Sequence, residues 1–453
     1  MTTTTITAAK LSWGAKIGWA AGTHGTAAMI GVLVTFMLSF LTRVVGIDAA
    51  VAGLIIFASR FYDMIADPVM GHISDRTRSS IGRRRVYLLW GALACFVTYG
   101  ALFDFPDFDS MAAKIAYAAV LLFLFNTAYT VFNIPYLAMP AEMTGSYHER
   151  TVLMSIRVVF FTTATLMLFG GNAALIGRYG AAEGWPLFGW ITGAAVGISM
   201  LIAFVATRGT PHTVRSENVA LPMAAQMKLV LANRPFAIFL GVKLLQLTAQ
   251  ASSNAALLFF GAYVLNNEQA LQIAFAIYFP LGTFIAIPLW TMAGKRFGKR
   301  ACYMAAALLY AAVMMSWLAA APGEAAVLTN ARLGVLGATV AGILVMGFAI
   351  LPDTIEYDRR MTGINREGVY AGIYSTMEKL AAAFGPLIFG TYLSAAGFIA
   401  GEAGAVTVQP GAAVNAIYMG VAVIPAVASV LSAALLWFYD LSEEKLKAAG
   451  SAG

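Results

Sequence analysis

Charged and reactive side chains are scarce in this chain of 453 residues. Only 11% of its residues are charged, and it contains two cysteines and four histidines. Cys95 and Cys302 lie far apart in the sequence, which argues against a disulfide framework or a cysteine metal pair. The sequence also lacks the H-E-x-x-H, G-x-S-x-G and Walker-type glycine motifs. We therefore expect no cofactor, and a membrane-embedded enzyme or receptor is a disfavoured alternative.

Apolar residues dominate what is present. They make up 60% of the chain, and its mean hydropathy is +0.76, unlike that of soluble globular domains. A helix needs about 20 residues to cross roughly 30 Å of hydrocarbon. The sequence therefore predicts an all-α membrane protein with twelve transmembrane helices, near 13–41, 49–74, 86–104, 111–141, 152–176, 185–207, 236–265, 269–292, 301–321, 327–352, 368–397 and 412–440.

Basic residues are distributed unevenly between the connections of these helices. Most of the 29 Lys and Arg residues fall on one side, whereas Arg43, Lys114, Arg178 and Arg332 fall on the other. The positive-inside rule then places both termini in the cytoplasm, in an inner or plasma membrane. The net charge of +7 thus reflects orientation, and we expect no nucleic-acid partner.

A repeated pattern divides the chain into two halves. The longest polar connection, 208–235, separates predicted six-helix bundles at 1–207 and 236–453, the second with a short cytoplasmic tail. Each half has a basic turn after its second helix, at 71–85 and at 295–300. Such repeats predict two pseudo-symmetric bundles with a cavity between them, and alternating access by rocking of the halves.

Four of the charged residues inside predicted membrane helices form one set: Arg60, Asp63, Asp67 and Lys379. Arg60, Asp63 and Asp67 are spaced i, i+3 and i+7, and therefore share one helix face. At the ordinary helical rise, Asp63 and Lys379 both lie about 16 Å from the cytoplasmic ends of their helices. Two carboxylates one turn apart repel unless a cation or proton lies between them, and Pro68 frees a backbone carbonyl nearby. The pattern predicts a cation site, with a static salt-bridge network as the alternative.

Two further helices carry polar stripes that suit a polyhydroxylated ligand or the outer ligands of an ion. Interhelical hydrogen bonding without a ligand is the alternative for each member. The candidate residues are Asn126, Tyr129, Thr130 and Asn133 in 111–141, and Lys243, Gln246, Gln250 and Asn254 in 236–265.

Single residues add less specific signals. Arg157 either contacts a ligand oxygen or pairs with Glu142 or Glu149 at the cytoplasmic edge. Tyr374 either stacks on a ligand or fills a gap, as tyrosines in membranes often do.

The loops on the cytoplasmic side offer a candidate gate. Opposite charges in the basic turn and in the stretch after the tenth helix would form ion pairs that break when the inward face opens, and plain solvated charge is the alternative. The gate candidates are Asp75, Arg76, Arg83, Asp353, Glu356 and Arg359.

Three motifs together resemble the glycoside-pentoside-hexuronide:cation symporters, the melibiose permease group within the major facilitator fold. They are R-F-Y-D-M-I-A-D-P-V-M-G with the basic turn after it, Y-T-V-F-N-I-P-Y-L before E-R-T, and L-P-D-T-I-E-Y with Lys379 downstream. The resemblance spans both halves and most of the chain.

The resemblance implies roles for five residues. Asp63 and Asp67 look like the cation-site carboxylates, and Thr130 looks like a hydroxyl ligand. Lys379 looks like the charge that links ion and substrate, and Arg157 looks like a sugar-contacting arginine.

Departures from the pattern fall mainly in the galactoside pocket. Ala27 and Asn133 stand where the melibiose permease pattern has aspartates, and Leu137 stands in place of a tryptophan. Ala66 also replaces an asparagine between the cation carboxylates. The coupling residues are therefore better preserved than the galactoside pocket.

We therefore expect a symporter coupled to Na⁺ or H⁺ that imports a small polar solute, most simply a sugar, glycoside or uronide. A related permease for an amphiphile such as a lysolipid is the alternative. The expected partners are this solute and membrane lipids, and the expected state is a monomer.

Overall fold

The computed structural model describes residues 11–144, 147–209, 230, 232–362, 366–401, 408–441 and 445. Within these ranges the secondary structure is helical and contains no strand. The helices are α1 (Trp13–Gly31), the π-helical η1 (Val32–Phe36), α2 (Met37–Arg43), α3 (Ala49–Arg76), α4 (Arg85–Phe103), α5 (Met111–Met143), α6 (Tyr147–Ala206), α8 (Arg234–Tyr263), α9 (Glu268–Phe297), α10 (Lys299–Ser316), the 3₁₀ turn η2 (Trp317–Ala319), α11 (Ala326–Thr362), α12 (Glu367–Ala395), α13 (Gly411–Tyr418), the π-helical η3 (Met419–Val423) and α14 (Ile424–Leu436).

Local chemistry explains where these helices begin and break. The Asp48 carboxylate caps α3 by accepting backbone N–H bonds of 2.9 and 3.3 Å from the first turn. Inside α6, Gly180 has a φ of 75°, a conformation that glycine adopts without strain. Gly180 thus separates the two predicted membrane helices that α6 covers, 152–176 and 185–207.

Helix length and composition confirm the all-α membrane class. In the described part of the chain, nine helical stretches are long and apolar enough to cross a membrane, with α6 counted as one. Neither α8 nor α12 is among them, although both are long and carry several of the predicted polar site residues. The number of twelve membrane helices stays a prediction.

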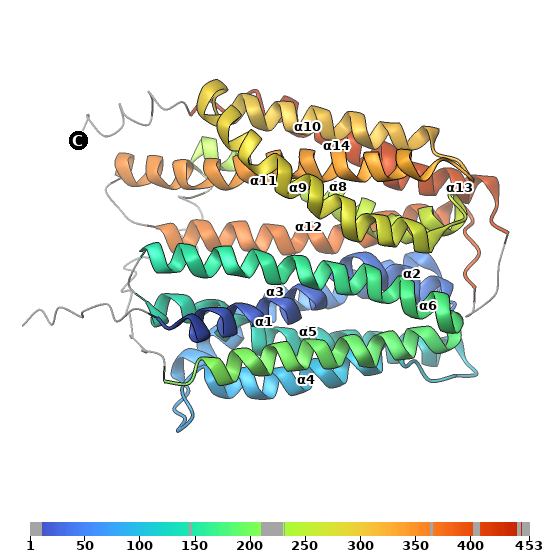
Figure 1. Ribbon diagram of the computed structural model, residues 1–453, viewed down its shortest axis with the longest axis horizontal. Coiled ribbons are helices and arrows are strands. Elements are labelled where there is room, and N and C mark those ends of the chain that lie inside the picture. The colour runs from blue at the N-terminus through green and yellow to red at the C-terminus, as the bar shows by residue number, and fades with distance from the viewer. Residues whose placement is uncertain are drawn as a thin grey trace, which may run out of the picture.

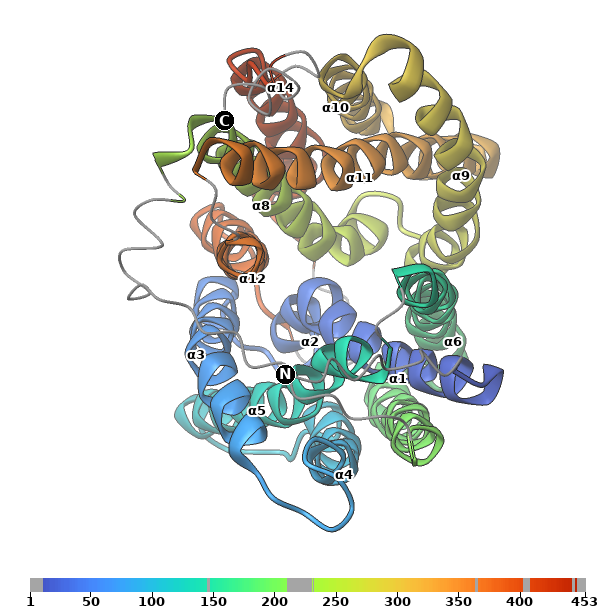
Figure 2. The same cartoon turned by 90° about the vertical axis from the view of Figure 1, so that its left-hand side faces the viewer.

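The helices form two groups. We name α1 to α6 the N-terminal group and α8 to α14 the C-terminal group (Figure 1). Most helices pack mainly within their own group, whereas α3 and α12 pack most extensively against each other. Figure 2, viewed along the helices, shows α12 beside α3 and α9 beside α6, where the groups meet. Most of the predicted linker 208–235 lies outside the described residues, so the domain boundaries also stay a prediction.

Small residues bring the two groups into backbone contact along α3 and α12. A side-chain carbon at Gly53 would lie 2.8 Å from the carbonyl oxygen of Pro386, and one at Gly390 would lie 2.3 Å from that of Ala49. Both contacts lie toward the end of the bundle where α3 begins. We call this the far end, and we call the opposite end, where α1 begins and α14 ends, the terminal end (Figure 1).

Candidate functional site

Asp63 and Asp67 lie on successive turns of α3, inside the bundle. Asp63 is fully buried and Asp67 is half-buried. The Thr130 hydroxyl of α5 hydrogen-bonds Asp63 and lies 3.0 Å from a carboxylate oxygen of Asp67. Because a hydroxyl carries one proton, it donates to one carboxylate at a time. The structure thus gathers two carboxylates and a hydroxyl between α3 and α5.

The ammonium of Lys379 reaches the same point from α12, in the other helix group. It hydrogen-bonds Asp67 and lies 3.3 Å from an oxygen of Asp63. The guanidinium of Arg60 lies 3.5 Å from that same oxygen. Two cations therefore balance two carboxylates away from bulk water, as buried charge requires. The contact agrees with the equal depth inferred for Asp63 and Lys379.

The polar stripe of α5 lies beside this cluster. Asn126, one turn from Thr130, is fully buried and donates to the carbonyl of Leu122 at 3.1 Å. Its side-chain oxygen accepts no hydrogen bond from the described residues, so an acceptor is left for a ligand or water. Tyr129 is buried within electrostatic range of Asp63, and Asn133 is buried on the same helix.

Only some of the polar residues predicted along α8 contact one another. Lys243 is 2% exposed, and its ammonium lies 3.5 Å from the side-chain oxygen of Gln246. Gln250 is half-buried further along the helix. Tyr374 of α12 is buried and stacks on Phe239 of α8, with ring centroids 6.2 Å apart. Its ring therefore fills a gap between these helices in this conformation.

Arg157 on α6 does not make the edge pairings considered from the sequence. Glu142 binds arginines of the basic turn, and Glu149 binds a lysine of α1. The half-buried Arg157 forms no hydrogen bond or ion pair with another described residue, and it lies within electrostatic range of Tyr129 and Tyr136. Neither of the two edge pairings is therefore present among the described residues.

The gate candidates of the N-terminal group pair within that group. Asp75 of α3 binds Arg84 at 2.7 Å, and Arg83 binds Glu142 of α5. Arg76 is exposed. These pairs hold the basic turn against α3 and α5.

The gate candidates of the C-terminal group also pair locally. Asp353 binds Lys299 of α10 at 2.6 Å, and Glu356 binds Arg359 of its own helix at 2.7 Å. Among the residues that the structure describes, no ion pair joins 353–362 to the basic turn at 71–85. The predicted gate is not assembled in this conformation.

Polar contacts at the far end do join the two groups, and sequence reasoning missed them. Arg43 of α2 binds Glu268 of α9 at 2.7 Å, and its guanidinium lies 5.4 Å from the ring centroid of Tyr263. Ser394 of α12 donates to Asp48, the cap of α3, at 2.8 Å. No sequence signal pairs Arg43 with a residue so distant in the chain.

Residues 18–443 match the family described as MFS/sugar transport protein. The chain belongs to this family. The isoprimeverose transporter of Lactiplantibacillus pentosus is 25% identical over 442 residues, covering 95% of this chain and 89% of that relative. The glucuronide carrier protein homolog of Escherichia coli (strain K12) is 25% identical over 446 residues, covering 97% and 94%.

Solved structures agree on the fold. The crystal structure of a D-xylose-proton symporter has a TM-score of 0.66 and 15% identity to this chain, covering 95% of it and 98% of that protein. The family match and this structural likeness confirm the predicted major facilitator fold. The family match and the relatives confirm the resemblance to glycoside and hexuronide symporters. As a member of the MFS/sugar transport family, the chain is a multi-pass membrane transporter and not an enzyme.

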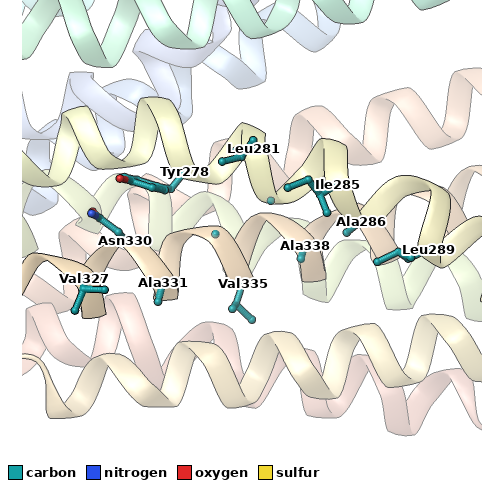
Figure 3. Close-up of a pocket in the computed structure, with 12 residues that line it drawn as sticks. Tyr278, Leu281, Ile285, Ala286, Leu289, Val327, Asn330, Ala331, Val335 and Ala338 are labelled. Atoms are coloured by element: carbon teal, nitrogen blue, oxygen red, sulfur yellow. The ribbon is translucent and has the colours of Figure 1, made fainter.

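A cavity of about 540 Å³ between α9 and α11 does not resemble a sugar site (Figure 3). Leu281, Ile285, Leu289 and Val335 line it, and each is more than half exposed. Polar groups are few on this surface, so it offers little hydrogen bonding to a polyhydroxylated solute. The polar residues of the MFS/sugar transport member lie instead near α3, α5, α8 and α12.

Proposed function

We propose that this transporter is a symporter that couples the movement of Na⁺ or H⁺ to that of a small polar solute by alternating access. Asp63, Asp67 and Thr130 form its cation site. The solute is a sugar, a glycoside or a uronide, bound between the two helix groups by residues that include Asn126, Asn133 and Arg157.

The position of Lys379 carries this proposal. Its ammonium lies against both carboxylates, where a mobile cation would gain most from their charge. The cluster is already neutral, so an incoming cation would leave a net positive charge in a low-dielectric site. Cation binding therefore requires Lys379 to withdraw from Asp67.

Withdrawal of Lys379 changes how the two helix groups are joined, because Lys379 belongs to one and the carboxylates to the other. Loss of this ion pair frees the C-terminal group to rock against the N-terminal group. The displaced ammonium can then pair with the solute. This sequence of events couples cation binding to solute binding.

We further propose that the terminal end of the bundle is cytoplasmic. The basic turn lies at this end, as the positive-inside rule requires. The groups are joined by Arg43–Glu268 and Asp48–Ser394 at the far end. This arrangement is that of an inward-facing transporter, closed to the outside.

The partners follow from the same reasoning. Two of the relatives are named for isoprimeverose and for glucuronides, which supports a glycoside or uronide as the solute. The apolar groove between α9 and α11 suits the acyl chain of a membrane lipid. All of the proposed site residues lie on one chain, so a monomer suffices for transport.

The test is uptake into proteoliposomes made with the purified full chain. Labelled isoprimeverose, methyl β-D-glucuronide and a lysophosphatidylcholine are offered under an inward Na⁺ gradient, an inward H⁺ gradient, or neither. We expect one of the two sugars to accumulate only under a gradient, and an ionophore that dissipates the gradient should abolish accumulation.

The other outcomes contradict the proposal in distinct ways. Accumulation of the lysolipid alone would favour the amphiphile permease. Gradient-independent equilibration of a sugar would show facilitated diffusion and remove the cation site from the mechanism.

A further inference from the structure

Two lysines of the described helices are buried, and only one of them has a counter-charge in contact. Lys16 of α1 is 9% exposed, and its ammonium lies 2.9 Å from a carboxylate oxygen of Glu149. Lys243 of α8 is 2% exposed, and no carboxylate of the described residues lies within 4 Å of its ammonium. A buried cation without an anion beside it is costly at membrane depth, so Lys243 needs an explanation.

The groups that touch the Lys243 ammonium are neutral. The side-chain oxygen of Gln246 lies 3.5 Å from it and also accepts the hydroxyl hydrogen of Tyr303 on α10. The ring centroid of Tyr303 lies 5.9 Å from the ammonium, near the outer limit of a cation–π contact. A side-chain carbon at Gly347 of α11 would lie 3.2 Å from the nitrogen. An ammonium has three N–H donors, so one shared acceptor leaves most of its hydrogen-bonding capacity unused.

The helix that carries Lys243 lies at the interface between the two helix groups. It packs against α12 and α14 and also contacts η1 and α2 of the N-terminal group, and Figure 2 shows it between α11 and α12 on the side that faces α2. Leu244, the next residue, is 36% exposed, and Gln250 is half-buried. Because other helices surround α8, these side chains face the space between the groups. The flexible stem of a lysine brings its ammonium to that surface by a change of rotamer.

We propose that Lys243 is an anion subsite of the solute pocket and binds the carboxylate of an acidic sugar, such as a uronide. The carboxylate accepts the hydrogen bonds that the ammonium does not make in this conformation, and it neutralises the buried charge. The inference rests on the proposed function and narrows its solute from sugars in general to acidic ones.

The first experiment is isothermal titration calorimetry of the full chain in lipid nanodiscs. The two ligands are methyl β-D-glucuronide and methyl β-D-glucoside, in which a hydroxymethyl group replaces the carboxylate. We expect the wild type to bind the glucuronide more tightly. Lys243→Gln should weaken glucuronide binding by roughly 10- to 100-fold and change glucoside binding little, whereas Lys243→Arg, which keeps the charge, should retain the preference. Lys16→Gln is the control and should keep the wild-type ratio of affinities.

Thermal melts of the protein without sugar provide a second arm. Lys243→Met should raise the melting temperature, because an unbranched apolar side chain replaces a buried charge that has no partner in contact. Lys16→Met should lower it, because Glu149 loses its counter-charge. Added glucuronide should raise the melting temperature of the wild type and not that of Lys243→Met.

The competing partner of Lys243 within the protein is Glu378 of α12, which lies within electrostatic range of it. If Lys243 only neutralised Glu378, Lys243→Met would lower the melting temperature, and Lys243→Gln would weaken both sugars equally. Either result would overturn the anion subsite. So would an unchanged ratio of affinities in Lys243→Gln, or a wild type that does not bind the glucuronide. None of these results contradicts symport itself, which fails only if no sugar accumulates under a gradient in the uptake assay.

Discussion

Among the described residues, ion pairs join the N-terminal and C-terminal groups at two places, and these two contacts are built differently. At the far end, Arg43 binds Glu268 and also packs its guanidinium on the rings of Phe259 and Tyr263. Inside the bundle, Lys379 binds Asp67 and Asp63. Arg43 has a bound carboxylate and aromatic faces, whereas Lys379 shares its carboxylates with Arg60 and with the Thr130 hydroxyl.

This difference indicates which of the two contacts can respond to the coupling ion. A guanidinium held by a carboxylate and two rings is specific to its geometry, and a small ion cannot replace it. An ammonium is a point charge, and a Na⁺ ion can take its place between oxygens. Under the proposed function, the far-end pair would serve as a structural closure, and the inner pair would respond to the coupling ion.

The largest effect is expected from Asp63→Asn, which removes one side of the inner contact. Breaking a buried charge pair costs about 3–5 kcal/mol, so cation affinity should fall by roughly 100-fold or more. Concentrative uptake should be abolished in proteoliposomes while the protein elutes as a folded monomer. Retained uphill uptake would show that the cation binds elsewhere.

Lys379→Ala should separate the two functions of the inner contact. Without the competing ammonium, the carboxylates should bind Na⁺ more tightly, by roughly 10-fold. Accumulation driven by the gradient should fail, because the charge that links cation and solute is gone, whereas exchange of solute across the membrane should survive. A parallel loss of exchange would assign Lys379 to solute binding alone.

Arg43→Gln should loosen the far-end closure. Loss of a charged hydrogen bond of about 1.5–3 kcal/mol should shift the conformational equilibrium by roughly 10- to 100-fold toward opening. The measurement is the rate at which an impermeant maleimide labels the Ala173→Cys variant. At this end the backbone carbonyl of Ala173 accepts a hydrogen bond from the Gln269 side chain. The native cysteines, Cys95 and Cys302, are buried, and unchanged labelling would contradict the closure role.

Glu149→Gln is the matched control and should have the smallest effect. Glu149 binds Lys16 at 2.9 Å, and both residues belong to the N-terminal group. The variant should lower the melting temperature by a few degrees and leave labelling of Ala173→Cys unchanged. An effect on labelling would mean that pairs within a group also set the conformational equilibrium.

The same pair predicts a pH dependence. Burial opposes ionisation of Glu149, but hydrogen bonds from Lys16, the Leu11 amide and Thr144 outweigh it and hold the pKa below its ordinary value. A carboxyl whose folded-state pKa is lowered stabilises the fold above its unfolded pKa, near 4.3. Thermal melts should therefore lose this contribution as the pH falls below that value, and Glu149→Gln should lack this step.

More of the inner contact than of the far-end contact could be predicted from the sequence. Spacing along one helix placed Asp63 and Asp67 on one face, and depth in the membrane matched Lys379 to them, because helical geometry and the cost of buried charge are both local rules. Arg43 and Glu268 lie just outside the predicted membrane helices, in different connections of the chain. Their pairing depends on how the two helix groups pack.

The close backbone contacts at Gly53 and Gly390 fix the point about which α3 and α12 can tilt relative to each other. Arg76 lies about 35 Å along α3 from Gly53 at the ordinary helical rise. A tilt of about 10° around this point would displace the tip of α3 at the terminal end by about 6 Å, while atoms beside the glycines would hardly move. A bulkier residue at either glycine would separate α3 from α12 at this contact, so we expect such a substitution to impair the proposed rocking of the two groups.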